Sequence, residues 1–180
     1  GTLGFRVQRY GMLRWGDLFS ARQKLAMLTI CDAIEKVASD DPAVREILAL
    51  ALSRFASICN SLCWWRSTEN KATAMFTRQA IPFVWDFVEA PIFAQQAGDY
   101  QVTLENVLRV LRALPRVNRS GQVQVADACA SPLPDEGAHV WFTDPPYYDA
   151  VPYSDLSDFF FVWLKRAFPG HELLRDPFDA

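Results

Sequence analysis

The sequence predicts an α/β fold in which a helical region precedes part of a parallel sheet. Residues 1–100 place apolar side chains at helical spacing, whereas residues 122–128 and 138–143 have the composition of strands. Helical patterns lie on both sides of these two segments, and this order of elements is typical of an α/β domain. We therefore predict a mainly helical region over 1–100 and a partial α/β unit over 101–180. Two strands are too few for a complete sheet.

The helical region contains two clear start signals. Ser20 to Gln23 matches a capping box ahead of an apolar pattern over 24–39. Asp41 and Pro42 form a cap and first-turn pair, which predicts a long helix over 43–65. A shorter helix is expected over Ala72–Ala80, before Pro82. Residues 83–93 mix β-forming residues with two acids and fit either a strand or an ordered loop.

The second region alternates helices with strands. Thr103 is placed to cap a helix over 104–114, which Pro115 ends. Residues 122–128 alternate as a strand does, and a loop with prolines leads to a second strand over 138–143. After it, Ser154 or Asp155 is expected to cap a helix over 156–168.

Composition restricts the class of protein. The chain of 180 residues is 51% hydrophobic, carries a net charge of −3 and has no apolar run long enough to span a membrane. We expect a soluble, cytoplasmic protein that does not bind membranes. The first residue is glycine rather than methionine, so we also expect the chain to belong to a longer one.

No general basic field is present, so binding of nucleic acid would depend on a local patch or on parts outside this chain. Arg109, Arg112, Arg116 and Arg119 form one candidate, although a solvated helix end is the simpler interpretation. Trp15, Trp64, Trp65 and Trp85 are expected in the core rather than as stacking platforms.

Metal binding is not expected. Cys59 and Cys63 are four residues apart, but a structural zinc site needs four ligands and no second pair follows. We interpret the cysteines as reduced, partly buried thiols.

The most informative residues follow the second predicted strand. Asp144 and the Pro145 carbonyl can both accept hydrogen bonds from an amino group, and proline holds its carbonyl rigidly without adding a donor. The Tyr147 ring can stack on a flat heterocycle. Asp127 ends the first predicted strand, so the two acids would share one crevice if the strands are neighbours.

Residues 144–147, Asp-Pro-Pro-Tyr, match the signature of S-adenosylmethionine-dependent amino-methyltransferases, chiefly those acting on adenine in DNA. With residues 4–11, 17–23, 76–90 and 143–166, most of the chain resembles the C-terminal half of the large adenine-specific DNA methylases, some of which carry a zinc ribbon. The resemblance implies a Rossmann-like methyltransferase sheet, S-adenosylmethionine as cofactor, and DNA and the remainder of the methyltransferase domain as partners.

The resemblance also implies roles for individual residues. Asp144 and the Pro145 carbonyl would hold the target amine, Pro146 would complete the motif, and Tyr147 would stack on the extruded base. Asp127 resembles the acid that approaches the adenine ring of the cofactor. The remaining residues of the extended signature would shape the substrate pocket: Tyr148, Asp149 and Tyr153.

The chain departs from the family in one important respect. The glycine-rich cofactor loop is missing, since Gly98, Gly121 and Gly137 are isolated, and the zinc ribbon is missing too. We therefore expect the main cofactor-binding loop outside this chain and a fragment that is inactive alone. Two alternatives stay open: methylation of amines in RNA, cytosine or protein, and a non-catalytic nucleic-acid-binding or assembly module.

Overall fold

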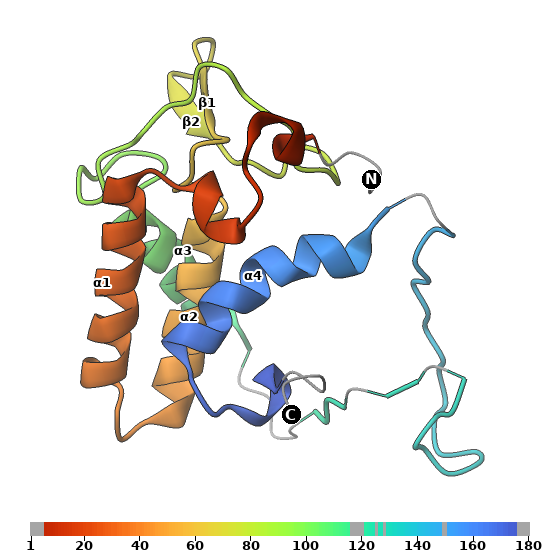
Figure 1. Cartoon of the computed structure of the whole chain (residues 1–180). Coiled ribbons are helices and arrows are strands. Elements are labelled where there is room, and N and C mark those ends of the chain that lie inside the picture. Colours follow the sequence, from red (N-terminus) through yellow and green to blue (C-terminus); the bar gives the residue numbers. More distant parts are fainter. Residues whose placement is uncertain (1–5, 116–120, 125, 128, 149–150, 176–180) are drawn as a thin grey trace.

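The computed structural model describes residues 6–115, 121–124, 126–127, 129–148 and 151–175 (Figure 1). The elements are η1 (Val7–Tyr10), η2 (Trp15–Leu18), α1 (Ala21–Val37), α2 (Pro42–Ala56), β1 (Trp64–Arg66), β2 (Lys71–Thr73), α3 (Tyr100–Ala113), α4 (Tyr153–Ala167) and η3 (Glu172–Leu174). Helices α1, α3 and α4 all pack against α2, and α4 also contacts α1. The result is a helix-rich fold with one small antiparallel sheet among the described residues.

The two predicted helix starts are confirmed. The Ser20 side chain accepts a hydrogen bond from the Gln23 N–H, and the Gln23 side chain accepts one from the Ser20 N–H, which completes a capping box. The Asp41 carboxylate accepts from the Val44 N–H, with Pro42 in the first turn of α2. These bonds satisfy backbone donors that a helix start leaves without partners.

Two predicted helices differ from the structure. α2 ends at Ala56 instead of continuing to residue 65, because Asn60 donates to the Ala56 carbonyl and accepts from the Leu62 N–H in a buried turn. The helix expected over 72–80 is wrong, since its first residues belong to β2. β1 and β2 pair antiparallel, with Trp64 opposite Thr73.

The helices of the second region start earlier than predicted. α3 begins at Tyr100, and its cap is Asp99 rather than Thr103. The buried Asp99 carboxylate accepts from the Val102 N–H at 2.7 Å, whereas the Thr103 hydroxyl donates to the Asp99 carbonyl. α4 begins at Tyr153, so Ser154 and Asp155 both lie in its first turn, and neither caps it.

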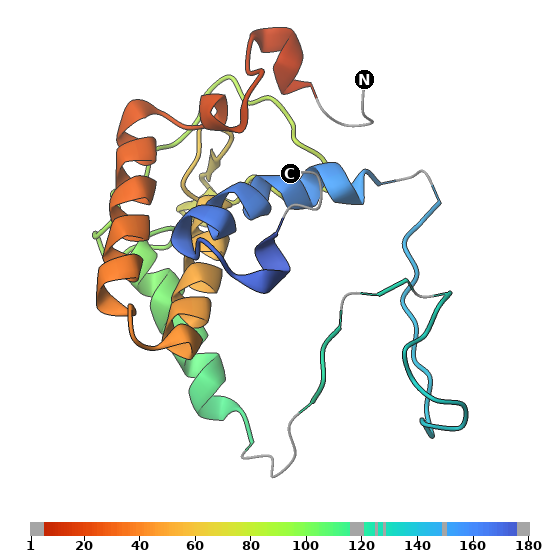
Figure 2. The same cartoon turned by 60° about the horizontal axis from the view of Figure 1, so that its bottom comes forward.

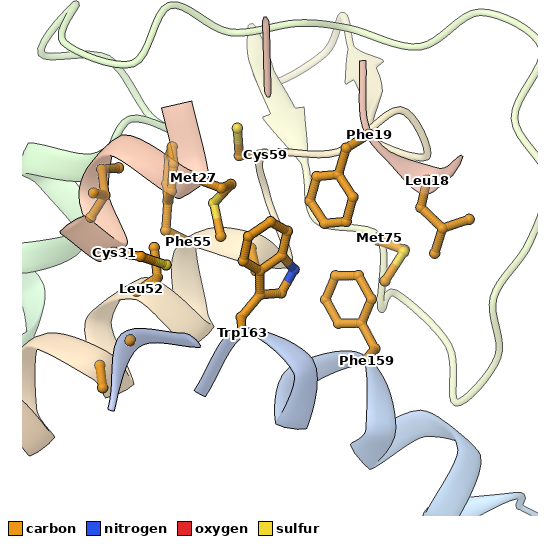
Figure 3. Close-up of a cluster of buried hydrophobic side chains, with 14 of the residues drawn as sticks. Leu18, Phe19, Met27, Cys31, Leu52, Phe55, Cys59, Met75, Phe159 and Trp163 are labelled. Atoms are coloured by element: carbon orange, nitrogen blue, oxygen red, sulfur yellow. The ribbon is translucent and has the colours of Figure 1, made fainter. Parts of the chain in front are cut away.

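In the hydrophobic core, α4 packs against the N-terminal helices. Phe159 and Trp163 of α4 are buried and face Phe19 and residues of α1 and α2 (Figure 3). The Phe19 ring stacks on Phe159 at 5.9 Å and meets Trp163 edge-on at 5.1 Å. The division of the chain near residue 100 stays a prediction, although helices from both sides of it pack on α2.

The two predicted parallel strands are not formed. None of the described residues in 122–128 and 138–143 belongs to a strand, so this structure contains no partial Rossmann-like sheet in its described part. A strand needs a neighbour to pair its backbone N–H and C=O groups. β1 and β2 pair only with each other. The described residues of 121–148 instead form an extended connection without helix or strand, which lies to one side of the helices in Figure 2.

Candidate functional site

Residues 121–148, called here the motif segment, carry the predicted site. Every described residue of this segment is exposed. The exposed side chains include large apolar ones that a strand would normally bury, with Phe142 at 91% and Trp141 at 62% exposure. The segment thus presents strand-type side chains that have no sheet or core to cover them.

The four motif residues are accessible rather than enclosed. Asp144, Pro145, Pro146 and Tyr147 are all exposed, and the Asp144 carboxylate accepts no hydrogen bond from another described residue. The neighbouring Tyr148 is fully exposed, at 100%. Acceptor groups and flat rings are therefore available side by side in sequence, but they line none of the cavities of about 630, 330, 290 and 230 Å³ found among the described residues.

The extended signature also includes Tyr148, Asp149 and Tyr153, which were expected to shape the substrate pocket. Tyr153 is the first residue of α4, is partly exposed, and donates its N–H to the Val151 carbonyl. Asp149 lies outside the described residues. Of the predicted substrate pocket, the structure therefore describes only Tyr148 and Tyr153, and both of these side chains are exposed.

Asp127 has a local structural role. Its carboxylate accepts a hydrogen bond from the Cys129 N–H at 2.9 Å, and its carbonyl accepts from the Ala130 N–H. These bonds form a tight turn of the Asx type. Asp127 and Asp144 are both exposed, and the two neighbouring strands that were expected to bring them to one crevice are not present among the described residues.

The described residues do not by themselves fit S-adenosylmethionine. A cofactor of this size needs a concave site that covers most of its surface. Asp127 and Asp144 are exposed, and neither lines the cavities of about 630, 330, 290 and 230 Å³ found among the described residues. The motif segment supplies groups suited to the amine, but not an enclosure for the cofactor.

The predicted tryptophan positions are largely wrong. Trp85 is 77% exposed, and Trp64 and Trp65 are partly exposed on the hairpin. Trp15, as predicted, packs on the core and meets Phe159 edge-on. The sequence did contain a signal for the hairpin, because two short β-forming runs flank a polar turn over 67–70.

The predicted arginine patch is only partly described. Arg109 and Arg112 are exposed on α3, as a solvated helix end would be, whereas Arg116 and Arg119 lie outside the described residues.

Three of the four cysteines are buried free thiols, and Cys129 is exposed. Burial raises the pKa of Cys59 to about 12 and that of Cys31 and Cys63 to about 11. The Cys63 thiol donates to the Ile58 carbonyl. Among the described residues, no three His, Cys, Asp or Glu side chains lie close enough to hold a metal ion.

Comparisons with protein-family models, with curated proteins and with solved structures find no match to this chain. Within the described part, no helix is both long and apolar enough to cross a membrane.

Proposed function

We propose that this chain is part of an S-adenosylmethionine-dependent methyltransferase that acts on the exocyclic amino group of adenine in DNA. In this proposal the chain contributes the amine-binding motif, and other polypeptide contributes most of the sheet and the cofactor-binding loop. The fragment alone is then inactive.

The observation that supports the proposal is the exposure of the motif segment. Val140 and Phe142 are 80% and 91% exposed, although their sequence context is that of a buried strand. Strands of parallel sheets are apolar because both faces are covered. Exposed apolar patches mark interaction surfaces. A segment of this kind is suited to join a sheet, after which Asp144 would lie at the carboxyl end of a strand, where ligands bind in open α/β sheets.

The motif residues would bind and orient the amine. The Asp144 carboxylate and the Pro145 carbonyl would each accept one N–H of the amino group, which directs the nitrogen lone pair out of the plane of the base. The Tyr147 ring would stack on the base, an interaction worth about 1–3 kcal/mol. Such positioning lowers the barrier by orientation and electrostatics. S-adenosylmethionine would supply the methyl group from a site that the described residues do not form.

The test uses the protein expressed from its complete reading frame. It is incubated with S-adenosylmethionine and unmethylated plasmid DNA, and the nucleosides are analysed by mass spectrometry. We expect N6-methyladenine, and loss of at least about a hundredfold of it in Asp144→Ala because the amine loses its charged acceptor. The matched control is Asp135→Ala, which removes another exposed carboxylate of the motif segment and should retain full activity.

The same assay separates the alternatives. Formation of N4-methylcytosine would identify cytosine in DNA as the substrate instead of adenine. Methylation only of RNA or only of protein would identify that class of molecule as the substrate. Absence of methylation in every substrate, with retained binding of DNA by both Asp144→Ala and the unchanged protein, would instead support a non-catalytic nucleic-acid-binding module.

A further inference from the structure

A cavity of about 630 Å³ lies away from the motif segment. Its volume falls within the range of about 300–1,000 Å³ that is typical of small-molecule sites. α2 contributes Arg54, the β1–β2 hairpin contributes Arg66 and Lys71, and α3 contributes Asn106 and Val110. Elements far apart in the sequence therefore build one site.

The cavity is lined by three cationic side chains and by no acidic one. This contrasts with the chain as a whole, whose net charge is −3. Arg54 donates a hydrogen bond to the Ser57 hydroxyl and forms no ion pair with another described residue. A concave surface that gathers cations in this way attracts anionic ligands.

The two hairpin cations are held in place from outside the cavity. Arg66 and Lys71 both pair with Glu69, which does not line the cavity. Hydrogen bonds from Lys71 and then Arg66 lower the pKa of Glu69 to about 2, so this carboxylate stays ionised at neutral pH. Guanidinium and ammonium groups carry several donors each, and so both cations keep N–H groups for a ligand.

The remaining lining suits a ligand with a flat, partly apolar body. Ile58 and Val107 give the cavity apolar walls. The hydroxyl of Thr73, which also lines the cavity, is buried and has no hydrogen-bond partner among the described residues. Trp64 does not itself line the cavity, but it lies opposite Thr73 in the hairpin, and the guanidinium of Arg66, which does line the cavity, sits 5.5 Å from the centroid of the Trp64 ring. Arg66 thus combines a position in the cavity wall with an adjacent aromatic ring, a pairing that nucleic-acid-binding surfaces use.

We propose that this cavity binds a nucleoside phosphate, either free or within a nucleic-acid strand. Arg54, Arg66 and Lys71 hold the phosphate, and the apolar walls receive the base. The proposal goes beyond the methyltransferase motif, because no residue of 121–148 takes part. The two proposals are therefore independent. The cavity can bind a nucleoside phosphate even if no methylation is detected, and methylation can be detected even if the cavity binds none.

The experiment measures binding to the 180-residue chain by calorimetry and by fluorescence anisotropy. The probes are deoxyadenosine monophosphate, a labelled ten-nucleotide oligodeoxyadenylate and inorganic phosphate. The double variant Arg54→Gln/Lys71→Gln removes two cations of the cavity, and Lys36→Gln removes an exposed cation at the end of α1 as a control. Val110→Trp fills the cavity without changing charge, at a position that is 60% exposed and therefore tolerant of a larger side chain.

We expect the double variant to weaken binding roughly tenfold or more, with a shallower salt dependence, and Lys36→Gln to change it less than about twofold. Val110→Trp should also weaken binding roughly tenfold. Binding of the oligonucleotide alone assigns the site to a nucleic-acid strand, and binding of both organic probes extends it to free nucleotides. No binding of either organic probe at millimolar concentration would overturn the proposal. The proposal would also be overturned if Lys36→Gln weakened binding as much as the double variant does, or if Val110→Trp did not weaken it. The same holds if inorganic phosphate bound as tightly as the organic probes.

Discussion

Phe159 provides a direct test of how α4 is attached to the rest of the chain. Its side chain is fully buried, and its ring lies within about 6 Å of the rings of Trp15, Phe19, Phe76 and Phe160. Three of these partners come from segments outside α4. The ring therefore joins α4 to η2, to the start of α1 and to the loop after β2.

Replacing Phe159 with alanine should lower the free energy of unfolding substantially. Burial of a phenylalanine side chain contributes about 1.5–3 kcal/mol, and the cavity left behind brings the usual cost to about 3–5 kcal/mol. We expect the upper half of this range, because rigid rings surround the site and cannot collapse into the space. In a chain of this size, a loss of about 4–5 kcal/mol lowers Tm by about 8–20 °C.

The assay is urea denaturation of the chain, followed by circular dichroism. The matched control is Phe142→Ala, because Phe142 in the motif segment is 91% exposed. We expect that control to change the free energy of unfolding by less than about 0.5 kcal/mol. A cost above about 1.5 kcal/mol for Phe142→Ala, or one below about 1 kcal/mol for Phe159→Ala, would refute the assignment of α4 to the core and of the motif segment to the surface.

Three further predictions concern thiols, pH and a glycine. At pH 8 we expect only the Cys129 thiol to react quickly with a disulfide reagent in the folded chain, because burial raises the pKa of the other three thiols. All four thiols should react after denaturation, and fast reaction of a second thiol in the folded chain would contradict this prediction. A hydrogen bond from Arg22 holds the pKa of Glu89 below its usual value, so this contribution to stability is present above about pH 4.3 and is lost as pH falls through the folded-state pKa. Glu89→Gln should flatten that part of the stability profile measured by urea denaturation, and an unchanged profile would contradict the ion pair. Gly98 has a φ of +103°, and an added Cβ would lie 3.2 Å from the Ile58 side chain. Gly98→Ala should therefore lower the free energy of unfolding by about 1–3 kcal/mol in the same assay. An unchanged free energy of unfolding would argue against this backbone conformation.

Local signals in the sequence predicted the starts of α1 and α2, whereas α3 and α4 begin earlier than predicted. The capping box at Ser20 and the cap at Asp41 depend on side chains that bond to backbone within three residues, so they need no tertiary information. The end of α2 was harder to predict. Apolar residues continue past Ala56, and the helix gives way to a buried turn in which Asn60 donates to the Ala56 carbonyl and Ser61 donates to the distant Leu18 carbonyl.

Strands were predicted poorly for a related reason. The alternation at 122–128 and the apolar run at 138–143 indicate residues suited to a sheet, but pairing depends on a neighbour that the described residues do not supply. The candidate motif could be found from four residues, because Asp144 to Tyr147 combine acceptors with a stacking ring. The surroundings of the motif could not be predicted in this way, because a pocket is built by elements that the local sequence does not specify.

Hydrogen exchange of the backbone amides in residues 138–143 tests most directly the proposal that these residues form a strand only when other polypeptide supplies a sheet for them to join. In this chain alone we expect exchange at nearly unprotected rates, because the segment is exposed and unpaired. In the protein expressed from its complete reading frame, we expect the same amides to be protected by pairing within a sheet. Protection already present in this chain alone, or unprotected exchange in both proteins, would contradict the account.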